Sequence, residues 1–119
     1  MISAKENLLI IPLLLILAIF SAGCLDTSFG AVEYSYPLLN VEINNAGDEA
    51  DAYIQVTVFD LSGFRQIETG KYVEDVHLNT GQNLVSVPIE LEKGDYKLYL
   101  YLIENDERKV AEIRDIGVE

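Results

Sequence analysis

The amino-acid sequence predicts an all-β protein, with a two-sheet β-sandwich of about seven strands and Greek-key connections over residues 35–119. Hydrophobic and polar residues alternate with a period of two in this part of the chain, which is typical of half-buried strands. Turn-forming glycine, asparagine and aspartate residues separate the alternating runs. No stretch after Cys24 shows a helical period over ten residues. About 85 residues can bury one modest core, so a single domain is expected.

The first half of this region contains three of the expected strands. The run YPLLNVEIN, residues 36–44, and the run AYIQVTVFD, residues 52–60, are separated by the polar loop NAGDEAD. A turn then leads into a less regular extended run over residues 65–78, in which a break is expected at Gly70. The side chains expected to face the core in the first two runs are Leu39, Val41, Ile43, Ile54, Val56 and Val58.

Two further strands are predicted in the second half. The run LVSVPIEL, residues 84–91, contains Pro88, which has no backbone donor, so this strand is expected at a sheet edge or with a bulge at that point. Residues 96–103 alternate strictly after a tight turn. The side chains expected to face the core are Val85, Val87, Ile89, Leu91, Tyr96, Leu98, Leu100 and Leu102.

The last expected strand covers residues 110–119 and is joined to the preceding one by the polar hairpin ENDERK. Its two isoleucines, Ile113 and Ile116, are three positions apart instead of two. Because side chains alternate between the faces of a strand, this spacing predicts a bulge between them.

Residues 1–23 have the layout of a secretory signal peptide or a membrane anchor. Thirteen apolar residues, Leu8–Phe20, follow a short polar segment with Lys5, and small residues follow them at 21–23. The apolar core is short for a membrane span, which needs about 20 residues. The uncharged stretch Asn7–Leu25 leaves an uncleaved anchor open as the alternative.

The only cysteine, Cys24, comes directly after this segment. The trio Ala22-Gly23-Cys24 resembles the lipobox of prokaryotic lipoproteins, in which the cysteine thiol receives a lipid and the chain is cut just before it. The sequence departs from that pattern at Ser21, where the family has Leu or a similar aliphatic residue. The resemblance implies lipidation at Cys24, and residues 24–34 are interpreted as the anchor cysteine and a short tether.

The exported region also resembles a known domain family. Tyr96, in the stretch LEKGDYKLYLYL, resembles the tyrosine corner of immunoglobulin-like domains, and Leu98 stands where antibody domains have their second cysteine. Residues 36–119 are similar to the fibronectin-III-like and cell-adhesion-related modules of prokaryotic, in particular archaeal, surface proteins. The resemblance implies an immunoglobulin-like domain over residues 35–119 and leaves its activity open.

The charge excludes some partners. The formal net charge is −12, and this disfavours binding to nucleic-acid backbones and to anionic lipid headgroups. A single cysteine allows no internal disulfide, so the fold depends on its hydrophobic core. An exported domain without disulfides fits a prokaryotic envelope.

The chain is not expected to be an enzyme or to need a cofactor. Its only histidine, His77, is out of phase with Val76 and Leu78 and should face solvent. No G-x-S-x-G motif occurs, and a zinc site cannot be built from one histidine and a cysteine at the membrane. A weak calcium candidate exists in the polar loop, where Asp48 and its neighbours Glu49 and Asp51 offer carboxylate oxygens, although a solvated turn explains them better.

The strand over residues 96–103 offers a candidate partner-binding face. If its leucines point inward, Lys97, Tyr99, Tyr101 and Ile103 point outward and form an amphipathic strip. Tyrosine is favoured in interfaces and in sugar stacking, and cross-strand pairing is the alternative explanation. Tyr53 and Phe59 form a second, smaller outward set.

These observations predict a non-catalytic binding or structural module of the cell envelope. The membrane is its first partner, through a lipid on Cys24 or the hydrophobic segment, and it lies at the extracytoplasmic face. A further partner would be an envelope protein or a glycan. Two alternatives remain: a solute- or glycan-binding accessory lipoprotein that uses the tyrosine face, and a small anchored subunit of an envelope or transport complex.

Overall fold

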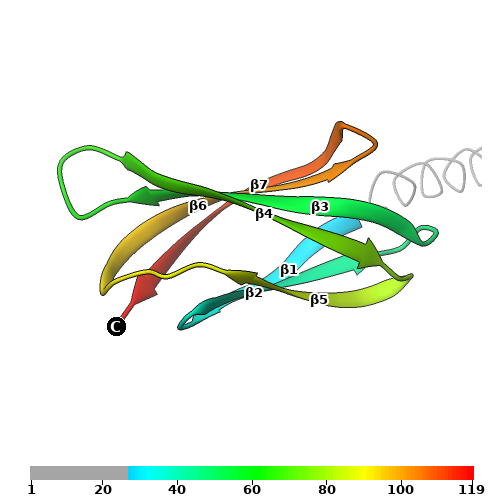
Figure 1. Cartoon of the computed structure of the whole chain (residues 1–119), viewed down its shortest axis with the longest axis horizontal. Helices are drawn as coiled ribbons and strands as arrows, with labels where there is room; N and C mark the ends of the chain where they lie inside the picture. Colours follow the sequence, from blue (N-terminus) through cyan, green and yellow to red (C-terminus); the bar gives the residue numbers. More distant parts are fainter. Residues whose placement is uncertain (1–26) are drawn as a thin grey trace, which may run out of the picture.

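The computed structural model describes residues 27–119, which form seven β-strands and no helix (Figure 1). The strands are β1 Thr27–Ser35, β2 Leu38–Asn45, β3 Ala50–Asp60, β4 Ile67–Leu78, β5 Gly81–Pro88, β6 Gly94–Glu104 and β7 Glu107–Val118. They pair antiparallel in two sheets, one of three strands in the order β1-β2-β5 and one of four in the order β4-β3-β6-β7. The all-β prediction is therefore confirmed for this part of the chain.

The N-terminal predictions concern residues that the structure does not describe. Both the expected signal or anchor, residues 1–23, and the expected lipidation site, Cys24, lie outside the described residues. Nothing within residues 27–119 forms a helix long and apolar enough to span a bilayer.

The two sheets enclose one hydrophobic core, an arrangement consistent with a β-sandwich. Each strand contributes alternate side chains to it, as the period of two requires. Every side chain that the sequence places in the core is buried: Leu39, Val41, Ile43, Ile54, Val56, Val58, Val85, Val87, Ile89, Leu91, Tyr96, Leu98, Leu100 and Leu102. The predicted register of these strands against the core is confirmed.

Two tyrosines fix the segment that crosses from β5 to β6. Tyr96 of β6 donates a hydrogen bond from Oη to the carbonyl of Glu92, at 2.8 Å, which is the bond that a tyrosine corner makes. Tyr34 of β1 donates to the carbonyl of Ile89, at 2.8 Å, and accepts from the backbone N–H of Leu91, at 2.9 Å. Burial, followed by the nearby carboxylates, raises the pKa of Tyr96.

The expected tether is shorter than predicted, because strand β1 begins at Thr27. Its alternation is hidden in the sequence by a bulge in which Gly30 and the next residue both oppose Glu42. The Glu42 carboxylate accepts a hydrogen bond from the backbone N–H of Ala31. Arg114 of β7 donates a hydrogen bond to the Gly30 carbonyl at 3.0 Å. These bonds satisfy backbone groups that the bulge leaves without a ladder partner.

The bulge predicted between Ile113 and Ile116 is wrong. β7 pairs regularly with β6 from Val110 to its end, so Ile113 faces outward and Ile116 packs against the core. The extra residue of β7 is Lys109. The spacing of the two isoleucines led to a wrong prediction because the inner face of β7 carries charged side chains between its apolar ones.

The extended run before residue 78 also differs from the prediction. β4 continues through Gly70, where a break was expected, and accommodates one extra residue, Thr69, as a bulge against β3. Thr69 donates its hydroxyl hydrogen to the Val58 carbonyl, and the ring of Tyr72 lies over Gly70, where a Cβ would come within 2.7 Å of the Tyr72 hydroxyl. The glycine therefore makes room for an aromatic ring, and the strand is not interrupted.

Candidate partner-binding face

The outer face of the four-stranded sheet carries the strip that the sequence singles out. Lys97, Tyr99, Tyr101 and Ile103 of β6 all point outward, as predicted, and they are half-buried. β6 is a central strand, so this strip is flanked by β3 on one side and β7 on the other. We call the outer surface of these strands and β4 the partner-binding face.

Neighbouring strands complete the partner-binding face. The register sets Tyr99 opposite Thr57 of β3 and Ile113 of β7, and it sets Tyr101 opposite Ala111 of β7. The rings of Tyr99 and Phe59 lie 4.9 Å apart at 55°, a tilted contact that aromatic pairs favour. Phe59, which the sequence suggested as part of a separate outward set, thus belongs to the same surface.

A shallow hollow lies beside the two tyrosines. Its volume is about 460 Å³, and its lining residues are Tyr99, Tyr101, Arg108, Ala111, Glu112 and Ile113. The Arg108 guanidinium lies 4.2 Å from the centre of the Tyr101 ring, close enough for a cation–π interaction. Ile113, at the other side of the hollow, is 54% exposed.

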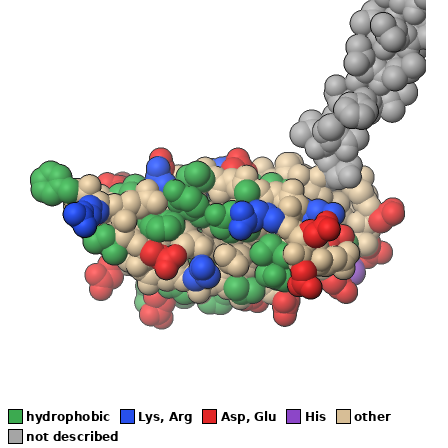
Figure 2. All heavy atoms as spheres, turned by 90° about the horizontal axis from the view of Figure 1, so that it is seen from above, with side chains coloured by type: hydrophobic (Ala, Val, Ile, Leu, Met, Phe, Trp, Pro, Cys, Tyr) green, Lys and Arg blue, Asp and Glu red, His purple; other side chains and the backbone are tan. Residues whose placement is uncertain are grey.

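This surface carries three cations beside the carboxylates of Asp51, Asp75 and Asp115. Lys71 of β4, Lys97 of β6 and Arg108 of β7 are three of the seven lysines and arginines among residues 27–119. Figure 2 looks down on the four-stranded sheet and shows hydrophobic side chains in the middle of the face, with blue side chains among them. The Lys97 ammonium lies 3.6 Å from the Asp115 carboxylate, which offsets part of this charge.

The contribution of β7 to this face is not evident from the sequence. Ala111, Ile113 and Arg108 come from a run whose irregular spacing led to an incorrect phase for Ile113. A strict alternation from Val110 onward, which the structure has, would have placed Ile113 beside the tyrosines. No sequence pattern indicates that Arg108 points outward, because it lies at a bulge next to the hairpin.

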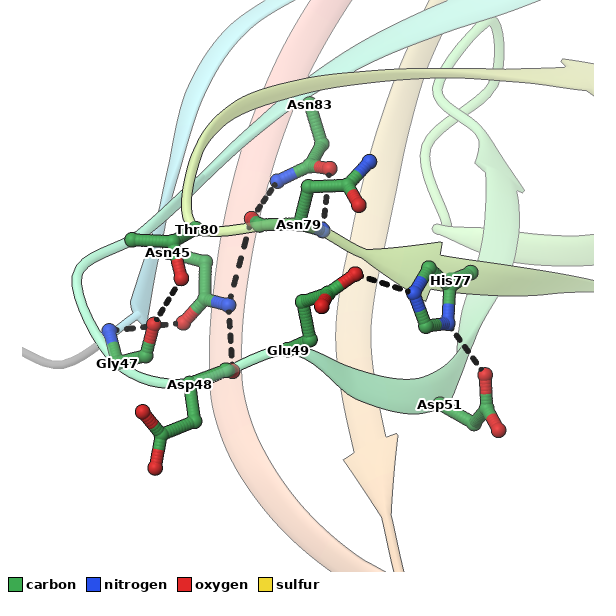
Figure 3. A network of polar contacts seen from close by, with 9 residues as sticks. All are labelled: Asn45, Gly47, Asp48, Glu49, Asp51, His77, Asn79, Thr80 and Asn83. Carbon is green, nitrogen blue, oxygen red and sulfur yellow. Dashed lines mark hydrogen bonds and ion pairs between the residues drawn. The ribbon is translucent and has the colours of Figure 1, made fainter.

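The three carboxylates of the calcium candidate do not converge. Glu49 and Asp51 point to opposite sides of the His77 ring, whereas Asp48 points away from both (Figure 3). The Glu49 carboxylate lies 3.0 Å from Nε2 of His77, and the Asp51 carboxylate lies 2.7 Å from Nδ1. Within residues 27–119, no three acidic, histidine or cysteine side chains lie so that they could hold a metal ion.

His77 faces solvent, as predicted, and its pairing with two carboxylates was not foreseen. Hydrogen bonds that the His77 ring donates to the carboxylates of Asp51 and then Glu49 raise the pKa of His77. Because carboxylates flank both ring nitrogens, the protonated ring can donate to both, and the neutral ring can donate to only one.

Asparagine side chains hold the loop that carries these carboxylates (Figure 3). The amide nitrogen of Asn45 donates to the carbonyl of Asp48, at 3.0 Å, and its amide oxygen accepts from the N–H of Gly47. Asn83 of β5 donates to the carbonyl of Asn79 at 2.8 Å and accepts from the N–H of the same residue. The two buried asparagines thus shape both segments where the chain changes sheets at this end.

Comparisons with known proteins show the fold alone. No family model and no curated protein matches the chain. A Bacteroides fragilis protein assigned as a β-galactosidase is similar with a TM-score of 0.52 and 14% identity, over 78% of this chain and 16% of that one. A β-glucosidase from Kluyveromyces marxianus matches with a TM-score of 0.48 and 20% identity, over 78% and 14%. This chain therefore spans only a small part of either glycosidase.

Proposed function

We propose that this chain is a non-catalytic binding module of the cell envelope, with an immunoglobulin-like domain anchored at the extracytoplasmic side of the membrane. We further propose that the partner-binding face binds another protein. The observation that carries the proposal is the continuous outer surface formed by Phe59, Tyr99, Tyr101 and Ile113, with Arg108 at its margin. An apolar, aromatic centre with an arginine and a polar rim is typical of protein interfaces.

The strand order supports the immunoglobulin-like assignment. β1, β2 and β5 correspond to strands A, B and E of such domains, and β3, β6 and β7 correspond to C, F and G. β4 pairs with β3 and not with β5, so the four-stranded sheet differs from the constant-type arrangement and is of the kind expected for fibronectin-III-like modules. The Tyr96 bond to Glu92 lies where a tyrosine corner would place it.

The state of His77 supports a non-catalytic role. A general base must offer an unprotonated ring nitrogen to its substrate. In His77, the only histidine of the chain, both nitrogens face carboxylates that favour the protonated ring. This arrangement suits a surface ion pair better than acid–base chemistry.

The location rests on the N-terminal sequence. The apolar run Leu8–Phe20, followed by small residues and Cys24, is the pattern of an exported, lipid-anchored chain. A lipid on Cys24 or a retained apolar segment would leave the β-domain outside the membrane in both cases. The described domain begins at Thr27, so only a few residues would separate it from the anchor.

The geometry favours a protein over a sugar as the ligand of the partner-binding face. Stacking of a sugar requires an open aromatic ring face. Arg108 already occupies one face of the Tyr101 ring, and Phe59 packs against Tyr99. A sugar would have to use the ring surface that these neighbours leave open, whereas a protein partner can cover the whole surface and bury Ile113.

Photo-crosslinking tests this proposal. A photoreactive phenylalanine analogue replaces Ile113 in the full chain, expressed in its native envelope, and the control carries it at Tyr36, which is 67% exposed and lies in the β1–β2 turn. We expect a discrete protein adduct from position 113 that is absent from position 36. The double substitution Tyr99→Ser and Tyr101→Ser should remove it. An adduct that resists protease and yields to glycosidases would replace the protein partner with a glycan, and equal adducts at both positions would refute a specific face.

A further inference from the structure

The four strands that end the two sheets are protected unequally. β1, β4 and β7 each contain an extra residue that bulges the strand, and each carries at least one charged side chain. β5, with the sequence GQNLVSVP, has no charged residue and pairs with β2 without a register shift. Bulges and charges are the usual means by which proteins prevent the pairing of exposed sheet edges. Of these four edge strands, β5 alone has neither a bulge nor a charged residue.

β5 lies at the edge of the three-stranded sheet (Figure 1), so half of its backbone N–H and C=O groups face away from β2. The N–H of Ile89 donates to the carbonyl of Pro37 at 3.0 Å, so the odd-numbered residues of β5 bond to β2. The N–H and C=O groups of Gln82, Leu84 and Ser86 therefore point to the open side. The backbone of Pro88 also points to the open side, so its missing N–H removes no hydrogen bond within the sheet. The edge position predicted for this strand is therefore confirmed.

We propose that this edge pairs antiparallel with β5 of a second copy of the chain, with the two-fold axis at Leu84. Such a contact is self-complementary, because Leu84 lies opposite Leu84 of the second copy and Gln82 lies opposite Ser86. A register shifted by two residues in one direction would set Gln82 opposite Pro88, which has no donor, and a shift in the other direction would set Ser86 opposite Thr80, outside β5.

Side chains at the axis favour a second copy as the occupant. Leu84 is 73% exposed on the outer face, opposite Glu42 of β2, and pairing would cover it with its symmetry mate. Two chains of net charge −12 repel each other, and this edge is the one at which pairing brings no charged strand residue together. An eight-residue strand buries less than about 1,000 Å², so the dimer is weak and reversible.

Register-specific disulfide formation tests the pairing. The full chain in detergent micelles carries Cys24→Ser, so that the introduced cysteine is its only thiol. Residues opposite each other in hydrogen-bonded antiparallel pairs have Cα atoms about 5.5 Å apart, which a disulfide can bridge. Under mild oxidation we expect Leu84→Cys to form a covalent dimer. Gln82→Cys and Ser86→Cys should form little dimer singly and a dimer of the two when mixed. Ile113→Cys, on the other sheet, is the control.

Two results would overturn the proposal: Leu84→Cys crosslinks no more than Ile113→Cys, or Gln82→Cys alone crosslinks as well as the mixture. Crosslinking of Leu84→Cys to a different protein would also overturn it. As a second measurement, Leu84→Lys added to the Gln82→Cys and Ser86→Cys chains should lower their mixed dimer about tenfold, because two like charges would meet at the axis. Leu84 is exposed, so far-UV circular dichroism should show an unchanged sheet. Failure of this test leaves the partner-binding face unaffected, since that face lies on the other sheet.

Discussion

The two tyrosines that hold the β5–β6 crossing should differ in their importance for stability. Tyr34 makes two hydrogen bonds through one hydroxyl, to the carbonyl of Ile89 and from the N–H of Leu91, whereas Tyr96 makes one, to Glu92. A typical hydrogen bond contributes about 1 kcal/mol net, and a buried donor left without a partner costs about 1–3 kcal/mol. Leu91 is buried, so Tyr34→Phe leaves the N–H of Leu91 without a hydrogen-bond partner and without access to solvent.

We therefore expect Tyr34→Phe to lower the free energy of unfolding by about 2–3 kcal/mol and Tyr96→Phe by about 1 kcal/mol. For a domain of this size, these losses correspond to a fall in Tm of roughly 10–15 °C and about 5 °C. The assay is urea unfolding of the full chain in non-ionic detergent, followed by far-UV circular dichroism, with Tyr53→Phe as the matched control on the outer face.

A double-mutant cycle separates the two tyrosines from each other. Both hold one five-residue crossing from opposite sheets, so the losses of Tyr34→Phe and Tyr96→Phe should not add, with a coupling energy of about 0.5 kcal/mol or more. The reasoning is refuted if Tyr34→Phe costs no more than Tyr96→Phe. It is also refuted if Tyr53→Phe costs as much as either.

Three further predictions follow from the described contacts and from the N-terminal sequence. Asn83→Ala removes a buried amide that bonds the Asn79 backbone in both directions, so urea unfolding should show a loss of about 1–3 kcal/mol. The raised pKa of His77 means that its pairing with Asp51 and Glu49 stabilises the fold fully below pH 6.5 and is lost as pH rises through the folded-state pKa. His77→Gln should therefore flatten the dependence of the urea midpoint on pH between about 6 and 8, and an unchanged slope would contradict the pairing. Mass spectrometry of the native protein should show a chain that begins at a lipid-modified Cys24, and an intact chain from Met1 would favour the retained anchor.

The core was predictable from the sequence because burial on one face of a strand imposes a period of two. Leu98, Leu100 and Leu102 could be assigned from alternation alone, and the same holds for Val85 and Val87. The failures occurred where a bulge or a charged side chain on the inner face interrupts this hydrophobic alternation. The bulge at Gly30 concealed β1, and the charged inner face of β7 led to an incorrect phase for Ile113.

The candidate site was predictable only as far as one strand extends. The outward direction of Tyr99 and Tyr101 follows from local alternation, but their neighbours depend on pairings between strands far apart in sequence. Phe59 is 40 positions from Tyr99, and Arg108 reaches Tyr101 only because of the bulge at Lys109. The pairing of His77 with Asp51 has the same origin, since the β3–β4 register sets them opposite each other.

The two proposed contacts use different sheets, and this separation has a consequence for binding. The partner-binding face belongs to the four-stranded sheet, and the β5 edge belongs to the three-stranded sheet, so a β5-paired dimer keeps both faces free. When a dimer holds two partner-binding faces together, binding of the first face raises the effective concentration of partner at the second. Avidity then increases without any new contact to the partner. Leu84→Lys should then weaken capture by a surface that displays many copies of the partner and leave the affinity for a single soluble partner unchanged. Equal weakening in both formats would mean that Leu84 itself contacts the partner, and no effect in either would mean that the edge does not pair on the membrane.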